Sequence, residues 1–217
     1  MLFRSATAPK KDAKKIVTPI FRVSFPHVFE ARAAMGEGEP KFGLTAVFDP
    51  KNFSTKDKER WKAMQALANE VCMAKFKKKL NDLPANFKKP VRDGAEKEGL
   101  AGFGAGLLFS NLTTKFKPGI VDKDGKTKII DDNEAFYPGC FARATITCYA
   151  YENKGKGVAF GLMNLQKVAD GARLDSRTDA EDDFGEEEIS AEDQAYLDKL
   201  DGVQADSEED TEEDGGF

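Results

Sequence analysis

The chain has 217 residues, which suffice for one sizeable hydrophobic core but not for two full domains. It contains no apolar run near the roughly 20 residues that a membrane span requires, and residues 1–15 lack the apolar centre of a signal peptide. Its single histidine, His27, allows neither a His pair nor a Ser-His-Asp constellation within one subunit, and no phosphate-binding P-loop motif occurs. We therefore expect a soluble cytoplasmic binding protein that is not an enzyme and carries no cofactor and no metal.

Charge is strongly segregated along the chain. The formal net charge is -5, yet residues 179–217 hold 18 acidic residues and one lysine, a net -17, and residues 1–178 hold 32 basic and 20 acidic residues, a net +12. Such asymmetry predicts a body that binds a polyanion and a tail that can mimic or displace it.

The first part of the chain predicts a mobile basic arm over residues 1–15, then two strands and a helix. Apolar and polar residues alternate over residues 17–25 and 41–48, the period of a half-buried strand, and Pro50 ends the second strand. From Ser54 the period becomes helical. The apolar positions expected to face the core are Val17, Phe21, Val23 and Phe25 in the first strand, and Trp61, Met64, Leu67, Ala68 and Val71 in the helix.

The second part is richer in strands. The glycines between residues 99 and 106 lack the spacing of a dinucleotide-binding turn and indicate a loop, and residues 119–130 predict a hairpin around Asp124-Gly125. Two long strands follow, over residues 140–153 and from residue 157. The chain is therefore mainly β, and a small barrel or twisted sheet with one principal amphipathic helix is favoured.

The strand CFARATITCYAY predicts a binding face. Its even positions, from Cys140 to Ala150, are small and apolar and should face inward. Its odd positions place an Arg, two Thr and three aromatic residues on the outer face, which is costly to expose unless a ligand covers it. Single-stranded nucleic acid could cover it, because bases stack on aromatic rings and cations follow the phosphates. The alternative is that both faces are buried within the protein.

The predicted contacts with nucleic acid combine aromatic residues of this face with cations nearby. They are Arg22, Lys41, Lys115, Phe116, Lys117, Arg143, Tyr149, Tyr151, Lys154 and Lys156. No helix-turn-helix, zinc finger or basic zipper is visible, so reading of duplex sequence is disfavoured.

The chain resembles the phage single-stranded-DNA-binding proteins of the Enc34-like group in the segments FPHVFEARA, KFGLTAVFDP, VRDG, KPGIVD and AFYPGCFARATITCYAYENKGKGVAFGLMNLQKVADGARL. The resemblance covers roughly residues 16–184. It implies a five-stranded oligonucleotide/oligosaccharide-binding (OB) barrel within residues 16–178, binding of single strands in phage replication or recombination without enzymatic activity, and a location in the host cytoplasm.

The resemblance also gives a meaning to the disordered acidic tail expected over residues 179–217. In such proteins an acidic tail tipped with an aromatic residue docks replication partners, here a polymerase, helicase or primase, and competes with DNA. The corresponding residues are Asp210, Glu212, Glu213, Asp214 and Phe217. The segment ISAEDQAYLDKL predicts a short capped amphipathic element within this tail. The sequence leaves open whether the protein is a monomer or a homodimer.

Three other functions fit parts of the pattern. An acidic-tailed chaperone for basic proteins or a duplex-coating architectural protein shares the charge asymmetry but does not need the aromatic face. A strand-annealing recombination factor would also bind single strands. A metal-dependent nuclease would have to be built on acid pairs such as Asp131-Asp132.

Overall fold

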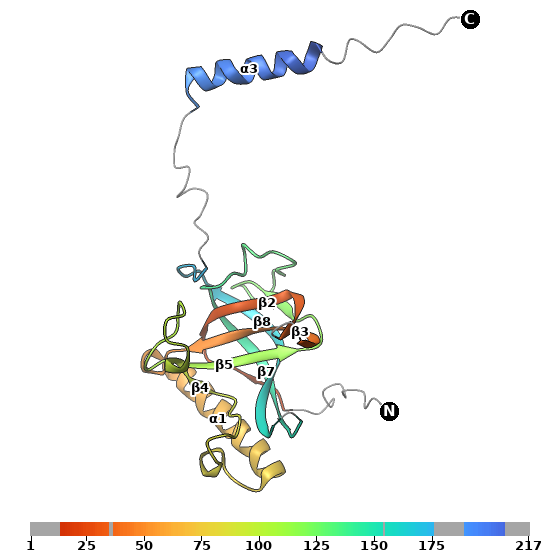
Figure 1. Cartoon of the computed structure of the whole chain (residues 1–217). Coiled ribbons are helices and arrows are strands. Elements are labelled where there is room, and N and C mark those ends of the chain that lie inside the picture. The colour runs from red at the N-terminus through yellow and green to blue at the C-terminus, as the bar shows by residue number, and fades with distance from the viewer. Residues whose placement is uncertain (1–13, 35–36, 154, 176–188, 207–217) are drawn as a thin grey trace, which may run out of the picture. The chain divides into compact units, whose positions relative to one another are not determined.

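The computed structural model describes residues 14–34, 37–153, 155–175 and 189–206 (Figure 1). The chain divides into two units, residues 1–176 and 177–217. The first unit contains all of the strands: β1 (Ile16–Val17), β2 (Phe21–Ala34), β3 (Glu37–Phe48), β4 (Arg92–Asp93), β5 (Leu108–Thr114), β6 (Gly119–Val121), β7 (Phe141–Tyr151) and β8 (Gly157–Ala169). Among the described residues, the α-helices are α1 (Thr55–Phe76) in the first unit and α3 (Ala191–Asp206) in the second.

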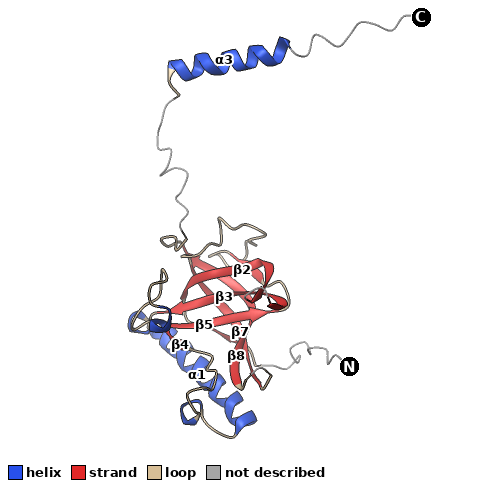
Figure 2. Ribbon diagram, in the orientation of Figure 1, coloured by secondary structure: helices blue, strands red, loops and turns tan. Residues whose placement is uncertain are grey.

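Five strands close into a barrel, which Figure 2 draws in red. The order around it is β2, β3, β5, β8 and β7, and β7 pairs back onto β2 to complete the ring. All of these pairings are antiparallel except that of β5 with β8. A closed five-stranded barrel with this crossover is the Greek-key arrangement of the OB fold. The predicted fold class is confirmed.

The core follows the predicted alternation in most places, but the prediction for Val17 is wrong, because this side chain is 38 % exposed. Phe21 and Val23 of β2 and Leu44 of β3 are buried, and the even positions of β7 from Ala142 to Ile146 face the same interior. Below the barrel in Figure 1, α1 contacts β1, β7 and β8. The buried residues of its apolar face are Met64, Leu67, Ala68 and Cys72.

Both ends of α1 are capped, and the first cap is Ser54, where the helical period of the sequence begins. The Ser54 hydroxyl accepts a hydrogen bond from the Asp57 backbone N at 3.1 Å, which satisfies one free donor of the first turn. At the other end Lys77 adopts a left-handed conformation, with φ of 60°, and its ammonium donates to the Ala74 carbonyl oxygen at 3.1 Å. Lys77 therefore has a structural role, because its positive charge lies at the C-terminal end of the helix.

A tight closure at the FYPG segment joins the start of β7 to the residues after β8. The Tyr137 hydroxyl lies 3.1 Å from Asp170 Oδ1 and accepts a hydrogen bond from the Gly171 backbone N at 3.1 Å. Arg22 Nη2 donates to the Ala172 carbonyl oxygen at 2.7 Å. Gly139 has a φ of 116°, and a Cβ there would lie only 2.2 Å from the same Ala172 oxygen. We call these residues, Arg22, Tyr137, Gly139 and 170–172, the terminal closure.

The prediction for Phe25 is wrong. The alternation places it inside with Phe21 and Val23, but the pairing of β2 with β3 shifts register between Ser24 and His27. In this bulge Phe25 has a φ of 46° and is 52 % exposed. A bulge adds a residue to one strand and so reverses the side to which the next side chain points.

The second unit contains α3, which agrees with the predicted capped element and extends beyond it. The Ser190 hydroxyl accepts from the Asp193 backbone N at 3.1 Å, and Tyr196 and Leu197 are exposed. The predicted partner-binding residues, Asp210, Glu212, Glu213, Asp214 and Phe217, lie outside the described residues. Among the helices that the structure describes, none has the length and apolar character needed to cross a bilayer.

Candidate nucleic-acid interface

A row of cross-strand partners runs around the outside of the barrel. His27 of β2 pairs with Gly43 of β3, Gly43 with Thr113 of β5, Thr113 with Gly161 of β8, and Gly161 with Thr147 of β7. The neighbours of these residues along each strand, such as Leu44 and Leu112, lie in the core, so the row faces outward. We call its outer side, together with the next turn of β7, the outer face.

Two glycines, Gly43 and Gly161, leave the middle of the outer face without side chains. A Cβ at Gly43 would lie 2.6 Å from the Leu112 carbonyl oxygen, and one at Gly161 would lie 2.8 Å from Thr147 Oγ1. Neither position can accept a side chain without movement of its neighbours. Gly43 is buried and Gly161 is half-buried, so the surface is lower here than at the side chains on either side.

The ring of Tyr149 packs over Gly161. Its Cε1 atom would lie 3.7 Å from a Cβ at Gly161, and its hydroxyl forms a hydrogen bond with the Thr113 side chain. Tyr149 is 43 % exposed. Burial of part of the side chain raises the pKa of the Tyr149 hydroxyl, so the ring stays neutral at physiological pH. This arrangement fixes one edge of the ring and leaves part of it accessible.

The Tyr151 ring packs against the Tyr149 ring. The two ring centroids are 6.4 Å apart with an interplanar angle of 50°. Tyr151 is only partly exposed, because its hydroxyl lies against Gly157, where a Cβ would come within 2.5 Å of it. Of the two predicted stacking residues, Tyr149 therefore offers the more accessible ring.

Polar side chains occupy the next row of the outer face. Thr45 of β3 pairs with Asn111 of β5, and the Thr45 hydroxyl donates to Asn111 Oδ1 at 2.9 Å. The amide of Asn111 is exposed. Thr45 is buried, so Asn111 is the member of this pair that can exchange hydrogen bonds with sugars or base edges.

Predicted cations lie at two ends of this face. Lys41 is paired with Arg32 across β2 and β3, and Lys115 and the 62 % exposed Phe116 follow directly after β5. At the hairpin between β7 and β8, Lys156 is exposed and its ammonium lies 3.9 Å from Glu152. Lys154 lies outside the described residues.

Two of these lysines already have acidic partners. The Lys115 ammonium pairs with Glu39 and the Lys117 ammonium pairs with Asp131, and all four side chains are substantially solvated. Exposed ion pairs of this kind are weak, so a phosphate can replace the carboxylate at little cost.

Two predicted contacts have protein partners instead. Arg22 belongs to the terminal closure, where its guanidinium donates to two backbone carbonyls. Arg143 Nε donates to Gln166 Oε1 at 2.7 Å, and the Gln166 amide in turn contacts the carbonyl oxygen of Lys123 at 3.2 Å. Both arginines thus stabilise the junctions of neighbouring segments.

A second aromatic group, which the sequence pattern does not predict, lies on the outside of the barrel. We call Phe25, Phe103, Phe109, Arg92 and Lys97 the Phe25 cluster. The Phe25 and Phe103 rings are stacked, with centroids 6.2 Å apart and planes at 28°, and Phe103 meets Phe109 edge to face at 5.6 Å. The Lys97 ammonium lies 4.9 Å from the centroids of both Phe103 and Phe109. Phe103 and Lys97 come from an irregular connector whose pattern has no period.

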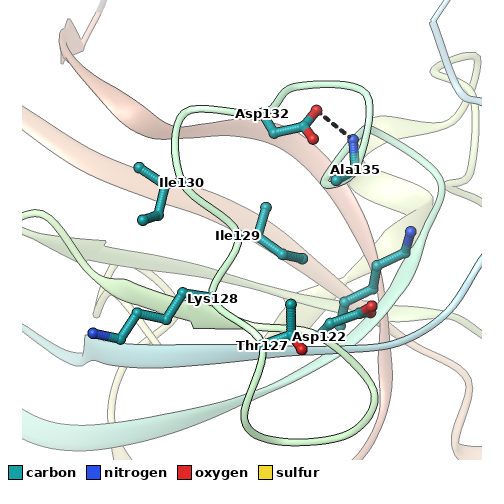
Figure 3. A pocket seen from close by; sticks show the side chains of 8 residues that line it. Asp122, Thr127, Lys128, Ile129, Ile130, Asp132 and Ala135 are labelled. Atoms are coloured by element: carbon teal, nitrogen blue, oxygen red, sulfur yellow. Dashed lines mark hydrogen bonds between the residues drawn. The ribbon is translucent and has the colours of Figure 1, made fainter.

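A separate depression of about 340 Å³ lies beside β6 (Figure 3). The residues that line it are Asp122, Thr127, Lys128, Ile129, Ile130, Asp132, Ala135 and Lys167. The Asp132 carboxylate accepts from the Ala135 backbone N at 2.8 Å, which ties it to its own turn. The mixed lining of two isoleucines and opposite charges contains no nucleophile paired with a base.

The remaining reactive groups do not form a catalytic set. Burial raises the pKa of the Cys140 thiol to about 11 and that of Cys148 to about 12, so both are protonated and poor nucleophiles at neutral pH. Within the described ranges, no group of three or more His, Cys, Asp or Glu side chains is placed to hold a metal ion.

Comparison with known proteins gives relatives from phages. Protein p50 of Acyrthosiphon pisum secondary endosymbiont phage 1 is 29 % identical over 162 residues, which cover 69 % of this chain and 80 % of p50. The single-stranded DNA-binding protein from bacteriophage Enc34, solved in complex with ssDNA, has a TM-score of 0.59 at 21 % identity and covers 74 % of this chain and 89 % of its own. The single-stranded DNA-binding protein gp2.5 of bacteriophage T7 has a TM-score of 0.51 at 14 % identity, with 82 % and 97 % covered.

The two solved structures establish likeness of fold. The family evidence comes from the sequence: the model described as "Enterobacter phage Enc34, ssDNA-binding protein" matches residues 14–195, which is most of the chain. This protein therefore belongs to the Enc34 family of phage single-stranded-DNA-binding proteins.

Proposed function

We propose that this protein binds single-stranded DNA, without sequence specificity, across the outer face of its barrel. The observation that carries the proposal is Tyr149, a half-exposed ring held above a floor of glycine in a member of this family. The name of the Enc34 protein solved with ssDNA supports the same ligand. Replication or recombination of phage DNA is the process in which such single strands arise.

Stacking explains why single strands are preferred. In a duplex the faces of the bases are covered by their neighbours, whereas an unpaired base can lie on an aromatic ring, which contributes about 1 to 3 kcal/mol per base. All four bases have such a face, so the contact is independent of sequence.

Cations on the same face supply the second part of the binding free energy. Lys41, Lys115 and Lys156 lie at its two ends, and each phosphate that a lysine neutralises releases condensed counterions. Affinity should therefore fall steeply with salt. The charge of +12 on residues 1–178 extends this attraction beyond the contacts themselves.

The acidic tail has two roles in this proposal. Its charge of -17 competes with DNA for the basic face and weakens non-specific binding, above all of duplexes. When single-stranded DNA displaces the tail, Phe217 and the acids before it become available to a polymerase, helicase or primase. Segregation of the charges supports both roles, because solubility alone does not require the acids to be at one end.

Removal of residues 179–217 is expected to tighten DNA binding about tenfold or more at low salt, with a larger gain for duplex than for single strands. The check is a salt series of affinities for the full chain and for residues 1–178, which retain the whole barrel. If residues 1–178 bind more tightly than the full chain at low salt and this difference disappears at high salt, the result supports a tail that competes with DNA. If neither form binds single-stranded DNA at low salt, the proposed function is wrong, and the acidic tail should be tested as a chaperone for basic proteins.

Deletion of Phe217 alone is expected to leave DNA affinity within about twofold, because one neutral residue changes no charge. The same deletion should abolish capture of replication proteins by the immobilised full chain. A variant that exchanges Asp210 and Phe217 keeps the composition and serves as the control for position. Capture of a polymerase, helicase or primase by the deletion variant at the wild-type level would contradict the docking role.

A further inference from the structure

We infer that Phe25 is a second base-stacking position, at the β2 side of the outer face, with Lys97 as the cation that accompanies it. This inference deepens the DNA binding proposed above and depends on it.

The backbone presents Phe25 to solvent at an energetic cost. Its φ of 46° lies in the left-handed region, which a bulky non-glycine residue seldom adopts. The bulge that contains it turns the ring outward between Val23, which is fully buried, and Val28, which is buried as well. An apolar ring that is 52 % exposed gains little from that position in the free protein. A ligand that covers the ring would bury the apolar surface that the folded protein leaves exposed.

The ring is already held on one side. Phe103 stacks on it at 6.2 Å between centroids, and Phe103 is itself set edge to face against Phe109, which is fully buried. Since about half of Phe25 is still exposed, a base can stack on the exposed part of the ring and extend the pair to three rings. A ring fixed in this way loses little conformational entropy when the base arrives.

Lys97 provides a charge beside the same rings. Its ammonium lies 5.2 Å from the Phe25 centroid, and among the described residues no carboxylate comes within 4.0 Å of it. The neighbouring Arg92 differs, because its guanidinium pairs with Glu96. Burial, and then the positive charge of Arg92, lowers the pKa of Lys97, and the negative charge of an approaching phosphate would favour the ammonium form. A stacked base and its phosphate therefore both find partners at this position.

The outer face connects this position to Tyr149. Ser24, directly before Phe25, pairs with Thr45, and Thr45 pairs with the exposed Asn111 of β5. On the other side of the bulge, His27 begins the row that reaches Thr113, the hydrogen-bond partner of Tyr149. In Figure 2 the strands β2, β3 and β5 follow one another across the barrel. One strand of DNA that crosses them can thus contact Phe25 and Tyr149 in turn.

The first test compares affinities for oligothymidine by fluorescence anisotropy at fixed salt. Phe25→Ala should bind about tenfold more weakly, Phe25→Leu nearly as weakly because it keeps the apolar volume without the ring, and Phe25→Trp at least as well as the wild type. Leu100→Ala, which truncates an exposed apolar residue in the connector that carries Phe103, is the matched control and should bind normally. Recovery of binding in the Trp variant distinguishes stacking from a change in stability.

The second test locates the base. With 2-aminopurine placed at successive positions of the oligonucleotide, stacking quenches its fluorescence, and one position should lose its quenching in Phe25→Ala but keep it in Tyr149→Ala. Lys97→Met should reduce the slope of log affinity against log salt by about one, whereas Lys97→Arg should retain it.

The outcomes separate the two proposals. A wild-type protein that fails to bind single-stranded DNA overturns the proposed function itself. A wild type that binds, with affinity reduced by Tyr149→Ala but equal in the Phe25 Ala, Leu and Trp variants, overturns only the assignment of Phe25. Loss in both Leu and Trp variants with no change in quenching at any position likewise rejects stacking at this residue.

Discussion

The double variant Tyr149→Ala, Tyr151→Ala is expected to bind single-stranded DNA at least about 2 kcal/mol more weakly than the wild type, a loss of roughly 30-fold. Tyr149 offers an accessible ring and Tyr151 fixes its position, with centroids 6.4 Å apart. Removal of both therefore deletes a stacking position together with its support. Anisotropy titrations with oligothymidine at one salt concentration measure the change.

Two controls distinguish stacking from other causes. Tyr149→Phe keeps the ring and loses only the hydrogen bond with Thr113, so its affinity should change by less than about 1 kcal/mol. Tyr196→Ala removes a tyrosine that is 62 % exposed on α3, in the other unit, and should have no effect. Unchanged affinity in a folded double variant would remove this face from the proposed binding surface.

The substitution Gly139→Ala should lower the free energy of unfolding by about 3 kcal/mol. The φ of 116° is unfavourable for any residue with a Cβ, and the new methyl would lie 2.2 Å from the Ala172 carbonyl oxygen. That oxygen also accepts the hydrogen bond from Arg22, so displacement of Ala172 breaks a second interaction. Urea unfolding followed by the fluorescence of Trp61 measures the loss.

Gly99→Ala is the matched control for this experiment. Gly99 also has a positive φ, of 94°, but a Cβ there would meet nothing within 4 Å. It should cost only the conformational part, about 1 kcal/mol. The difference between the two variants isolates the steric contribution of the terminal closure. Equal losses in both would show that Ala172 moves away freely and that the closure does not stabilise the barrel.

The alternation in β7 could be predicted because β7 pairs with β8 along its whole length. With one side of the strand in the core, the period of two determines that Tyr149 and Tyr151 face outward. The helix α1 followed from an equally regular pattern that starts at Ser54. The patterns alone left a barrel and a twisted sheet open, and the five-stranded barrel was implied by the family resemblance. In long periodic segments the position of a residue in the sequence directly predicts the direction of its side chain.

Prediction failed where tertiary contacts decide the outcome. The bulge at Phe25 is a local change of register that leaves the apolar pattern intact, so alternation assigned the ring to the wrong side. Lys97 and Phe103 reach Phe25 through an irregular connector, which no period describes. A count of positive charges also does not show the hydrogen bonds that Arg22 and Arg143 form within the protein, and contact of these two arginines with DNA stays a prediction.

The terminal closure also has a mechanical consequence. Every residue of the second unit is connected to the barrel through residues 170–175, and these are held by Tyr137, by Arg22 and by the hydrogen bond from the Leu174 backbone N to the Pro138 carbonyl oxygen at 2.9 Å. A pull applied through the acidic tail therefore loads these bonds first. The pairing of β7 with β8 bears the force only after they break, so tension on the tail does not act first on the last strand of the barrel.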